Sequence, residues 1–196
     1  MNVKSELTRL VGDGADVRLN DVDVRPDDVK VILINEVVPA DPAQDFYGSP
    51  DAEYLKTALP LLREAGADIG SIYDALDRGI YVTNAVKTPK VGYAVEKGAL
   101  EDSLPYLEAE LALFPNVKVV MLMGDVAKKA FNMIAKKATG RNAVPAGSTY
   151  KLRAGEFFHE GARVMPSYII TGGNLAIEKS KSTMIVEDLA AMLALI

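Results

Sequence analysis

The chain has 196 residues, of which 49% are hydrophobic and 25% charged, with 22 basic and 27 acidic side chains. This composition is typical of a globular protein and excludes a disordered tail or a collagen-like fibre. The chain has no cysteine and one histidine, His159, which excludes disulfides, thiolate metal sites, iron–sulfur clusters and a cysteine nucleophile. The single histidine also excludes a multi-histidine metal site, so we expect neither a metal nor a cofactor.

The length suits one domain spanning residues 1–196. No stretch approaches the roughly 20 apolar residues that a membrane-spanning helix needs. The start, MNVKSELTRL, lacks the apolar run of a secretory signal. We therefore expect a soluble, cytoplasmic protein without a membrane partner, and the sequence leaves its oligomeric state open.

The net charge of −5 hides an asymmetry along the chain. Residues 1–117 carry 11 basic and 21 acidic side chains, whereas residues 118–181 carry 11 basic and 4 acidic ones. A basic second half favours contact with phosphates, although lysines on solvated helix faces give the same pattern. The candidate contacts are Lys128, Lys129, Lys136, Lys137, Arg141, Lys151, Arg153, Lys179 and Lys181.

Short β-branched apolar runs predict strands, and apolar residues at helical spacing predict helices. In the first half of the chain, the predicted elements are a strand at Val29–Ile34, a Pro/Asp/Gly-rich loop at Val38–Asp51, helices at Ala52–Ala65 and Ser71–Leu76, a strand at Ile80–Val86 and a helix at about Glu101–Leu113. In the second half, they are a strand at Val117–Met123, a helix at Val126–Ala138, strands at Thr149–Arg153 and Arg163–Ile169, and a last helix at about Thr183–Ile196.

Three residues define predicted helix ends. Pro105 is compatible with a helix only in the first turn, so we place it there. Asp125 is the predicted N-terminal cap of the helix that follows it, because a short carboxylate can accept from the first free amides. Gly140 is the predicted stop of the same helix.

Strands that alternate with helices imply parallel β-α-β units. We therefore predict an α/β fold, a three-layer α/β/α sandwich around a central, mainly parallel sheet. Ligands of such sheets bind beyond the carboxyl ends of the strands. Three loops there carry polar residues: Asn35-Glu36 after the first strand, Asn84 to Pro89 at the second, and Gly124-Asp125 after the third.

Glu36 and Asn84 are the candidate chemical groups in these loops. A half-desolvated carboxylate at Glu36 would have a raised pKa and could activate a water molecule. An amide at Asn84 offers an acceptor and two donors, enough to read the edge of a base. The simpler alternatives are a glutamate that binds the amides of the next loop and an asparagine that satisfies a turn.

Phe46 and Tyr47, in the Pro/Asp/Gly loop, are candidates for stacking on a planar ligand. Aromatic residues that only fix the loop to the core would look the same in the sequence. The chain has neither a G-x-G-x-x-G nor a G-K-[ST] signature, which makes nucleotide triphosphates and dinucleotides poor candidate ligands.

Taken together in order, the motifs resemble the uracil-DNA glycosylase superfamily, and within it the bacterial and archaeal members akin to the fourth family. Tyr81–Lys87 matches the family pattern Y-[IV]-T-N-x-V-K. The other motifs pair as follows: Asn35–Pro39 with G-E-A-P-G, Met123–Ala127 with L-G-x-x-A, and Met165–Ile170 with H-P-S-Y-L-L.

The resemblance implies roles for individual residues. Glu36 would position or activate the hydrolytic water, and Asn84 would bind the pairing edge of a flipped base. The loop after Ser167 would enter the DNA groove, with Lys179 and Lys181 as the nearest candidates for phosphate contact. The implied partner is DNA with a modified base, and the implied reaction is hydrolysis of its N-glycosidic bond.

The chain also departs from the family pattern. Met165 stands where the family has the histidine that stabilises the departing base, and Thr88 replaces a cluster cysteine. A thioether donates no hydrogen bond, so a contribution of roughly 10²–10³ in rate is lost by analogy with oxyanion-hole deletions. Gly48–Asp51 lacks the stacking phenylalanine, so Phe46, Tyr47 or Tyr54 would supply the platform. His159 is the one remaining histidine that could reach the site.

Two further hypotheses stay open. A protein of the same fold could bind a nucleobase or nucleic acid without catalysis, which the loss of the histidine favours. An unrelated α/β hydrolase or transferase is the third, although the chain has no G-x-S-x-G nucleophile elbow and no second histidine.

Overall fold

The structure is a computed structural model that describes residues 1–196, apart from the side chain of Ala176. Its elements are α1 (Val3–Val11), η1 (Pro26–Asp28), β1 (Val31–Val37), η2 (Pro42–Gln44), α2 (Glu53–Glu64), α3 (Ile72–Asp77), β2 (Ile80–Val86), α4 (Lys97–Ala112), β3 (Val119–Met123), α5 (Asp125–Thr139), α6 (Thr149–Leu152), β4 (Phe157–His159), β5 (Ala162–Ser167), η3 (Gly173–Ala176) and α7 (Lys179–Leu193).

The strands form one five-stranded sheet in the order β2-β1-β3-β5-β4. β1, β2, β3 and β5 run parallel, and β4 pairs antiparallel with β5 at one edge. The parallel strands are almost wholly apolar because helices cover both of their faces.

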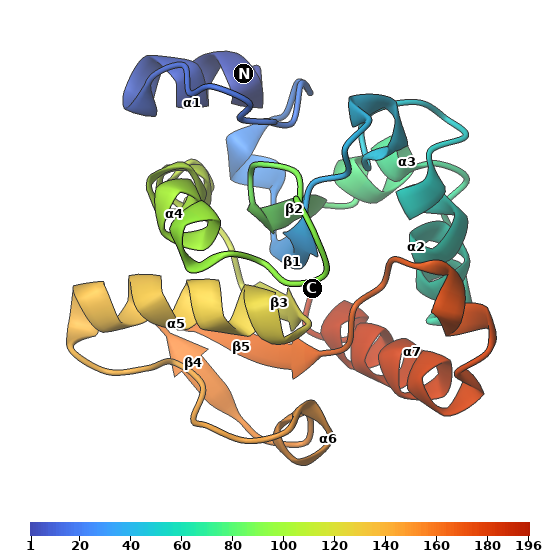
Figure 1. The fold of residues 1–196 in the computed structure, drawn as a ribbon. Coiled ribbons are helices and arrows are strands. Elements are labelled where there is room, and N and C mark those ends of the chain that lie inside the picture. Colours follow the sequence, from blue (N-terminus) through green and yellow to red (C-terminus); the bar gives the residue numbers. More distant parts are fainter.

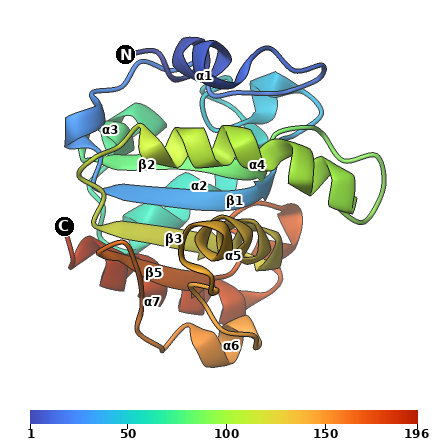
Figure 2. The same cartoon turned by 90° about the vertical axis from the view of Figure 1, so that its left-hand side faces the viewer.

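Helices α1, α4 and α5 lie on one face of the sheet, and α2, α3 and α7 lie on the other (Figures 1 and 2). Alternate residues of β1 feed the two cores: Ile32 and Ile34 pack on the first side, Val31 and Leu33 on the second. The predicted three-layer α/β/α fold is confirmed.

β1 extends three residues beyond the predicted strand and ends at Val37. Asn35 and Glu36 are therefore residues of the strand, and their side chains point to opposite faces of the sheet. In the pairing of β1 with β2, Asn35 lies opposite Asn84. The amides of Asn35 and Asn84 thus share the face covered by α2 and α7, and the carboxyl group of Glu36 lies on the α5 side.

The predicted strand at Thr149–Arg153 is wrong, because these residues form the one-turn helix α6. The alternation of Tyr150 and Leu152 with polar neighbours suggested a strand. The buried residues are Thr149 and Leu152, three apart, which is helical spacing.

Two predicted helix ends also need correction. The N-cap of α5 is Gly124 and not Asp125, whose exposed side chain pairs with Lys128. Pro105 lies in the middle of α4, because that helix begins at Lys97. Pro105 has no amide hydrogen to donate, so the carbonyl of Glu101 loses its helical hydrogen bond. Both residues are exposed, and water can donate to that carbonyl instead. Gly140 does end α5, in the left-handed conformation.

Besides the short 3-10 helices η1, η2 and η3, two elements have no counterpart among the predicted ones. α1 begins at the cap Asn2 and buries Val3 and Leu7 against α4. β4 is only three residues long and half-exposed, so it has little apolar signal. Among the described helices, none has both the length and the apolar character needed to cross a membrane.

A buried ion pair connects α4 to the end of β2. Lys87 Nζ donates to Glu110 Oε2 at 2.5 Å and to Thr83 Oγ1 at 2.8 Å. Tyr81 Oη donates to Glu110 Oε1 at 2.6 Å, and Asn20 Nδ2 donates to that hydroxyl. Tyr81, Thr83 and Lys87 of the motif Tyr81–Lys87 therefore stabilise the fold, because all three bind Glu110, a residue outside the motif.

Substituting Lys87→Met should lower the free energy of unfolding by about 3–5 kcal/mol, since Glu110 stays buried without a cation. Urea denaturation measures this loss. Lys97→Met removes an exposed pair with Glu101 and should change stability by less than about 0.5 kcal/mol. The double variant Lys87→Met/Glu110→Gln should recover most of the loss. A loss below about 1 kcal/mol for Lys87→Met would contradict this role of the pair.

Candidate functional site

The carboxyl group of Glu36 lies at the N-terminus of α5. Its Oε1 accepts a hydrogen bond from the Val126 amide at 3.1 Å. Gly124 makes this approach possible, because a Cβ there would collide with Oε1 of Glu36 and its φ of +106° is unfavourable for other residues. Glu36 thus occupies the position of a helix cap, which explains why Asp125 is not one.

Glu36 also opens onto a cavity of about 620 Å³ beyond the carboxyl ends of β1, β3 and β5. We call this the Glu36 cavity; its lining includes Glu36, Gly124, Asp125, Tyr150, Tyr168 and Lys181. Burial raises the pKa of Glu36, the Val126 amide lowers it in part, and the Asp125 carboxylate adds to the rise. A half-buried carboxylate of raised pKa, facing a cavity, can accept a proton from water.

Asn84 is 1% exposed and is held by a carboxylate from the loop after β1. Its Nδ2 donates to Asp45, at 2.9 Å to Oδ1 and 3.2 Å to Oδ2. Asp45 accepts in addition from the Phe46 amide at 2.8 Å. Burial raises the pKa of Asp45, and the hydrogen bonds from Phe46 and Asn84 oppose that rise.

Asn35 lies beside Asn84 and is equally buried. Its Oδ1 accepts a long hydrogen bond of 3.5 Å from the Ile170 amide. Two amide atoms in this pair have no partner: Nδ2 of Asn35 and Oδ1 of Asn84. A donor and an acceptor are therefore left free in one buried location.

Asn84 is not among the residues that line the Glu36 cavity. The hydroxyl of Tyr54 donates to the Val37 carbonyl, at the end of β1, at 2.8 Å. Burial raises the pKa of Tyr54 to about 12, and the carboxylates of Asp45 and Glu36 both add to the rise. The phenol is therefore within electrostatic reach of both sides of the site.

The two candidate stacking residues are committed to packing. Phe46 is fully buried and its ring contacts that of Tyr54, with 5.3 Å between the ring centroids. Tyr47 stacks on Tyr81 and accepts from the Val82 amide, which caps the free edge of β2. The Phe46 ring therefore has no face free for a ligand, whereas Tyr47 is partly exposed and has its ring stacked on Tyr81.

Ser167 and Met165, from the last motif, lie within β5. Ser167 is 1% exposed and its hydroxyl donates to Asp188 of α7 at 2.6 Å. Direct contact of Ser167 with DNA does not fit this burial; the residue fixes the start of the following loop. Met165 is opposite Met121 and packs in the core between the sheet and α7.

His159 is remote from the candidate site. It pairs with Ala162 at the amino end of β5, and its ring packs edge-on against Phe131. The site lies past Ser167 at the other end of that strand, about 17 Å away along the chain. His159 therefore cannot take the place of the missing family histidine.

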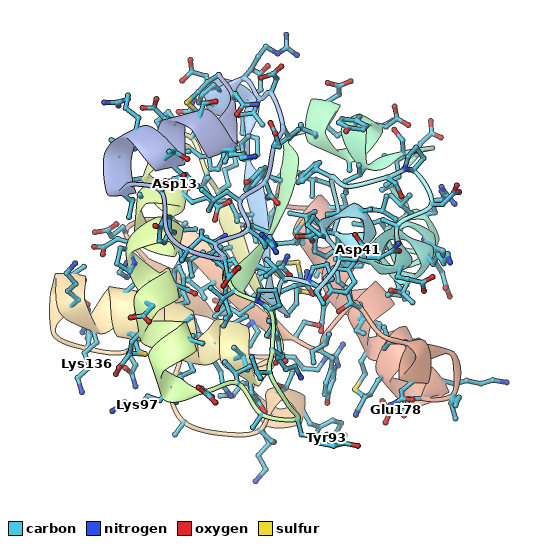
Figure 3. The ribbon with its side chains drawn as sticks, turned by 45° about the horizontal axis from the view of Figure 1, so that its top comes forward. Asp13, Asp41, Tyr93, Lys97, Lys136 and Glu178 are labelled. Carbon is cyan, nitrogen blue, oxygen red and sulfur yellow. The ribbon has the colours of Figure 1, made fainter. Side chains whose placement is uncertain are left out.

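Lys181 lies on the rim of the Glu36 cavity, 5.8 Å above the ring of Tyr168, and pairs with Glu178. Lys179, the first residue of α7, is exposed near it. Lys136 lies near the far end of α5, on the opposite side of the view from Glu178 (Figure 3). The basic residues of the second half thus do not form one surface.

Sequence reasoning placed Asn35 and Gly124 at the carboxyl edge of the sheet but gave them no role, and it did not single out Asp45. Asp45 is one of several acidic residues in its loop, and only the fold selects it. The sequence does indicate a role for Asn35, because a side-chain amide within an apolar strand needs a hydrogen-bond partner. No group of three or more acidic or histidine side chains that could hold a metal ion occurs in the described part of the chain.

None of the curated proteins matches this sequence. A family model does match, that of the uracil DNA glycosylase superfamily, over residues 29–187. The matched span holds all five strands and ends within α7, so it contains the sheet and every candidate group at its carboxyl edge. The chain is a member of the uracil DNA glycosylase superfamily.

Proposed function

We propose that this protein is a DNA N-glycosylase that hydrolyses the bond between deoxyribose and a flipped, deaminated or damaged base. The family membership supports the class of reaction. The observation that carries the proposal is the carboxylate of Glu36, which is oriented by the Val126 amide and faces a cavity of about 620 Å³ at the carboxyl edge of the sheet.

The chemistry required of Glu36 is modest. Cleavage of an N-glycosidic bond leaves positive charge on the sugar and negative charge on the departing base. An ionised Glu36 favours the cationic sugar and accepts a proton from the attacking water. Oε1 is fixed by the Val126 amide of α5, and we assign the attacking water to the other oxygen, Oε2.

We assign base recognition to Asn84. This residue lies on β2 opposite Asn35, which directly precedes Glu36 on β1. Reaching it requires a rearrangement, because Asn84 is buried beneath the loop that carries Asp45 and Phe46. Base flipping already costs a few kcal/mol, and hydrogen bonds to the pairing edge offset part of it.

A catalytically inactive base-binding or nucleic-acid-binding protein is the second candidate. Met165 favours it, because this side chain is buried in the core and supplies no donor to a departing base. Binding of oligonucleotides with no base release at stoichiometric protein would select this alternative.

The first prediction concerns base release from labelled oligonucleotides that contain uracil, hypoxanthine or xanthine, read out by alkaline cleavage of abasic sites. Glu36→Gln should slow release by about 10²–10⁴-fold, the contribution of a general base. Asp125→Asn alters an exposed carboxylate of the same cavity and should change the rate little. Equal release by the Glu36→Gln variant and the wild type would exclude Glu36 as the base.

The second prediction concerns stability against pH. Because the pKa of Glu36 is raised in the fold, the folded state binds the proton more tightly, and stability falls as pH rises from the ordinary value of 4.5 through the raised one. Glu36→Gln removes this dependence and should stabilise the protein at pH 7 by less than about 1 kcal/mol, since solvent screens a half-exposed charge.

Urea denaturation of the wild type and the Glu36→Gln variant at several pH values gives the difference directly. A destabilised variant at pH 7 would mean that the charge of Glu36 serves to cap α5 and has a structural purpose.

The third prediction concerns DNA binding. If Lys181 contacts a phosphate, Lys181→Ala should reduce the salt dependence of oligonucleotide binding by about one unit of slope. Lys136→Ala, near the far end of α5, is the matched control and should leave the slope unchanged. Fluorescence anisotropy over a range of salt concentrations measures both. Equal slopes for the two variants would place the DNA elsewhere.

A further inference from the structure

The starting observation is the pair of free amide atoms on β1 and β2. Polar atoms buried in proteins are nearly always hydrogen-bonded, yet Nδ2 of Asn35 and Oδ1 of Asn84 have no partner. Both side chains are 99% buried, so bulk solvent does not satisfy them. Two such atoms on adjacent residues of one sheet suggest a place kept for a ligand.

The geometry specifies that ligand. Asn35 and Asn84 are paired in register across β1 and β2, so their side chains leave the same face of the sheet from backbones about 4.8 Å apart. The free atoms have opposite character, one a donor and one an acceptor. They make no hydrogen bond to each other. The missing group must therefore accept from Asn35 and donate to Asn84.

Asp45 determines which way the Asn84 amide faces. An ionised carboxylate only accepts hydrogen bonds, so the amide nitrogen of Asn84 must be the atom that faces Asp45. The oxygen of Asn84 is then the atom left free. Asp45 is itself held by the Phe46 amide. Asp45 is therefore a positioning residue, which acts on a ligand through Asn84.

We propose that Asn35 and Asn84 together read the pairing edge of the base, and that Asp45 sets their preference for bases with a ring N–H beside a carbonyl. This inference rests on the proposed function, since it assumes that a base enters the site. The ring N–H would donate to Asn84 Oδ1, and the carbonyl would accept from Asn35 Nδ2. Uracil, hypoxanthine and xanthine carry this edge.

The same arrangement rejects the bases from which those lesions arise. Cytosine and adenine present an unprotonated ring nitrogen beside an amino group, which would set acceptor against acceptor at Asn84 and donor against donor at Asn35. A ligand that leaves the buried polar groups of its site without hydrogen-bond partners binds much more weakly than one that pairs with them. Guanine and thymine share the accepted edge, so the pair selects a class of base within which other contacts must discriminate.

The test uses free bases and nuclear magnetic resonance of the ¹⁵N-labelled full chain, so that it does not depend on catalysis. Uracil and hypoxanthine should shift the side-chain amide signals of Asn35 and Asn84, and cytosine and adenine at equal concentration should not. Asn35→Ala should weaken uracil binding about tenfold or more, by the loss of a buried hydrogen bond. Equal binding of uracil and cytosine by the wild type would overturn the inference.

Asp45→Ala is the decisive variant, because it frees the Asn84 amide to turn over. The ratio of uracil to cytosine affinity should fall at least tenfold, whereas Asp51→Ala, an exposed aspartate of the same loop, should keep it. An unchanged ratio for Asp45→Ala would overturn the inference, as would uracil binding that leaves both amide signals in place, the result expected if one buried water occupies the site.

The base-release assay run beside it separates the two proposals. Selective base binding with no release from any oligonucleotide supports the reading of the edge and contradicts the glycosylase proposal. Release by the wild type with an unchanged preference in Asp45→Ala contradicts only the inference about Asp45 and Asn35.

Discussion

The register that holds β1 between β2 and β3 determines where every candidate group lies. Because Asn35 is paired with Asn84, the two amides share a face. Because the next residue points the other way, the carboxyl group of Glu36 lies on the α5 side. A shift of one residue would exchange these faces and remove both arrangements. The buried pair of Lys87 and Glu110, which ties α4 to β2, supports this register from the outer strand.

The contact between Glu36 and α5 links the fold to the proposed chemistry. Gly124 lets the helix start close to β1, and Glu36 takes the capping position that a local side chain normally holds. The Val126 amide fixes Oε1, and the carboxyl group of Glu36 lines the cavity. Burial beside the helix raises the pKa of Glu36, and the Val126 amide opposes part of that rise. Such a cost to stability is common at catalytic groups of enzymes, the role that we propose for Glu36.

The sequence was sufficient for the layers and for the order of the main elements, because the apolar periodicity of β1, β2, β3 and α5 is strong. It was insufficient where tertiary contacts decide. α5 is capped by Glu36 from another element, so local rules selected Asp125. α6 was mistaken for a strand because one turn of helix is too short for its periodicity to show. Asp45 and Glu110 act through contacts with residues 39 and 23–29 positions away, which no local pattern contains.

This chain belongs to the uracil DNA glycosylase superfamily and has Met165 in the core. In the function that we propose, Glu36 is the carboxylate and Asn84 the base-reading amide. We propose that a flipped base lies with its pairing edge against both Asn35 and Asn84 and with its sugar facing Glu36. A crystal structure of the Glu36→Gln variant with a duplex containing a uracil–guanine mispair tests this most directly. We predict an extrahelical uracil on the two amides, beneath a displaced Asp45–Phe46 loop. A stacked uracil, or a duplex bound away from the carboxyl edge of the sheet, would contradict it.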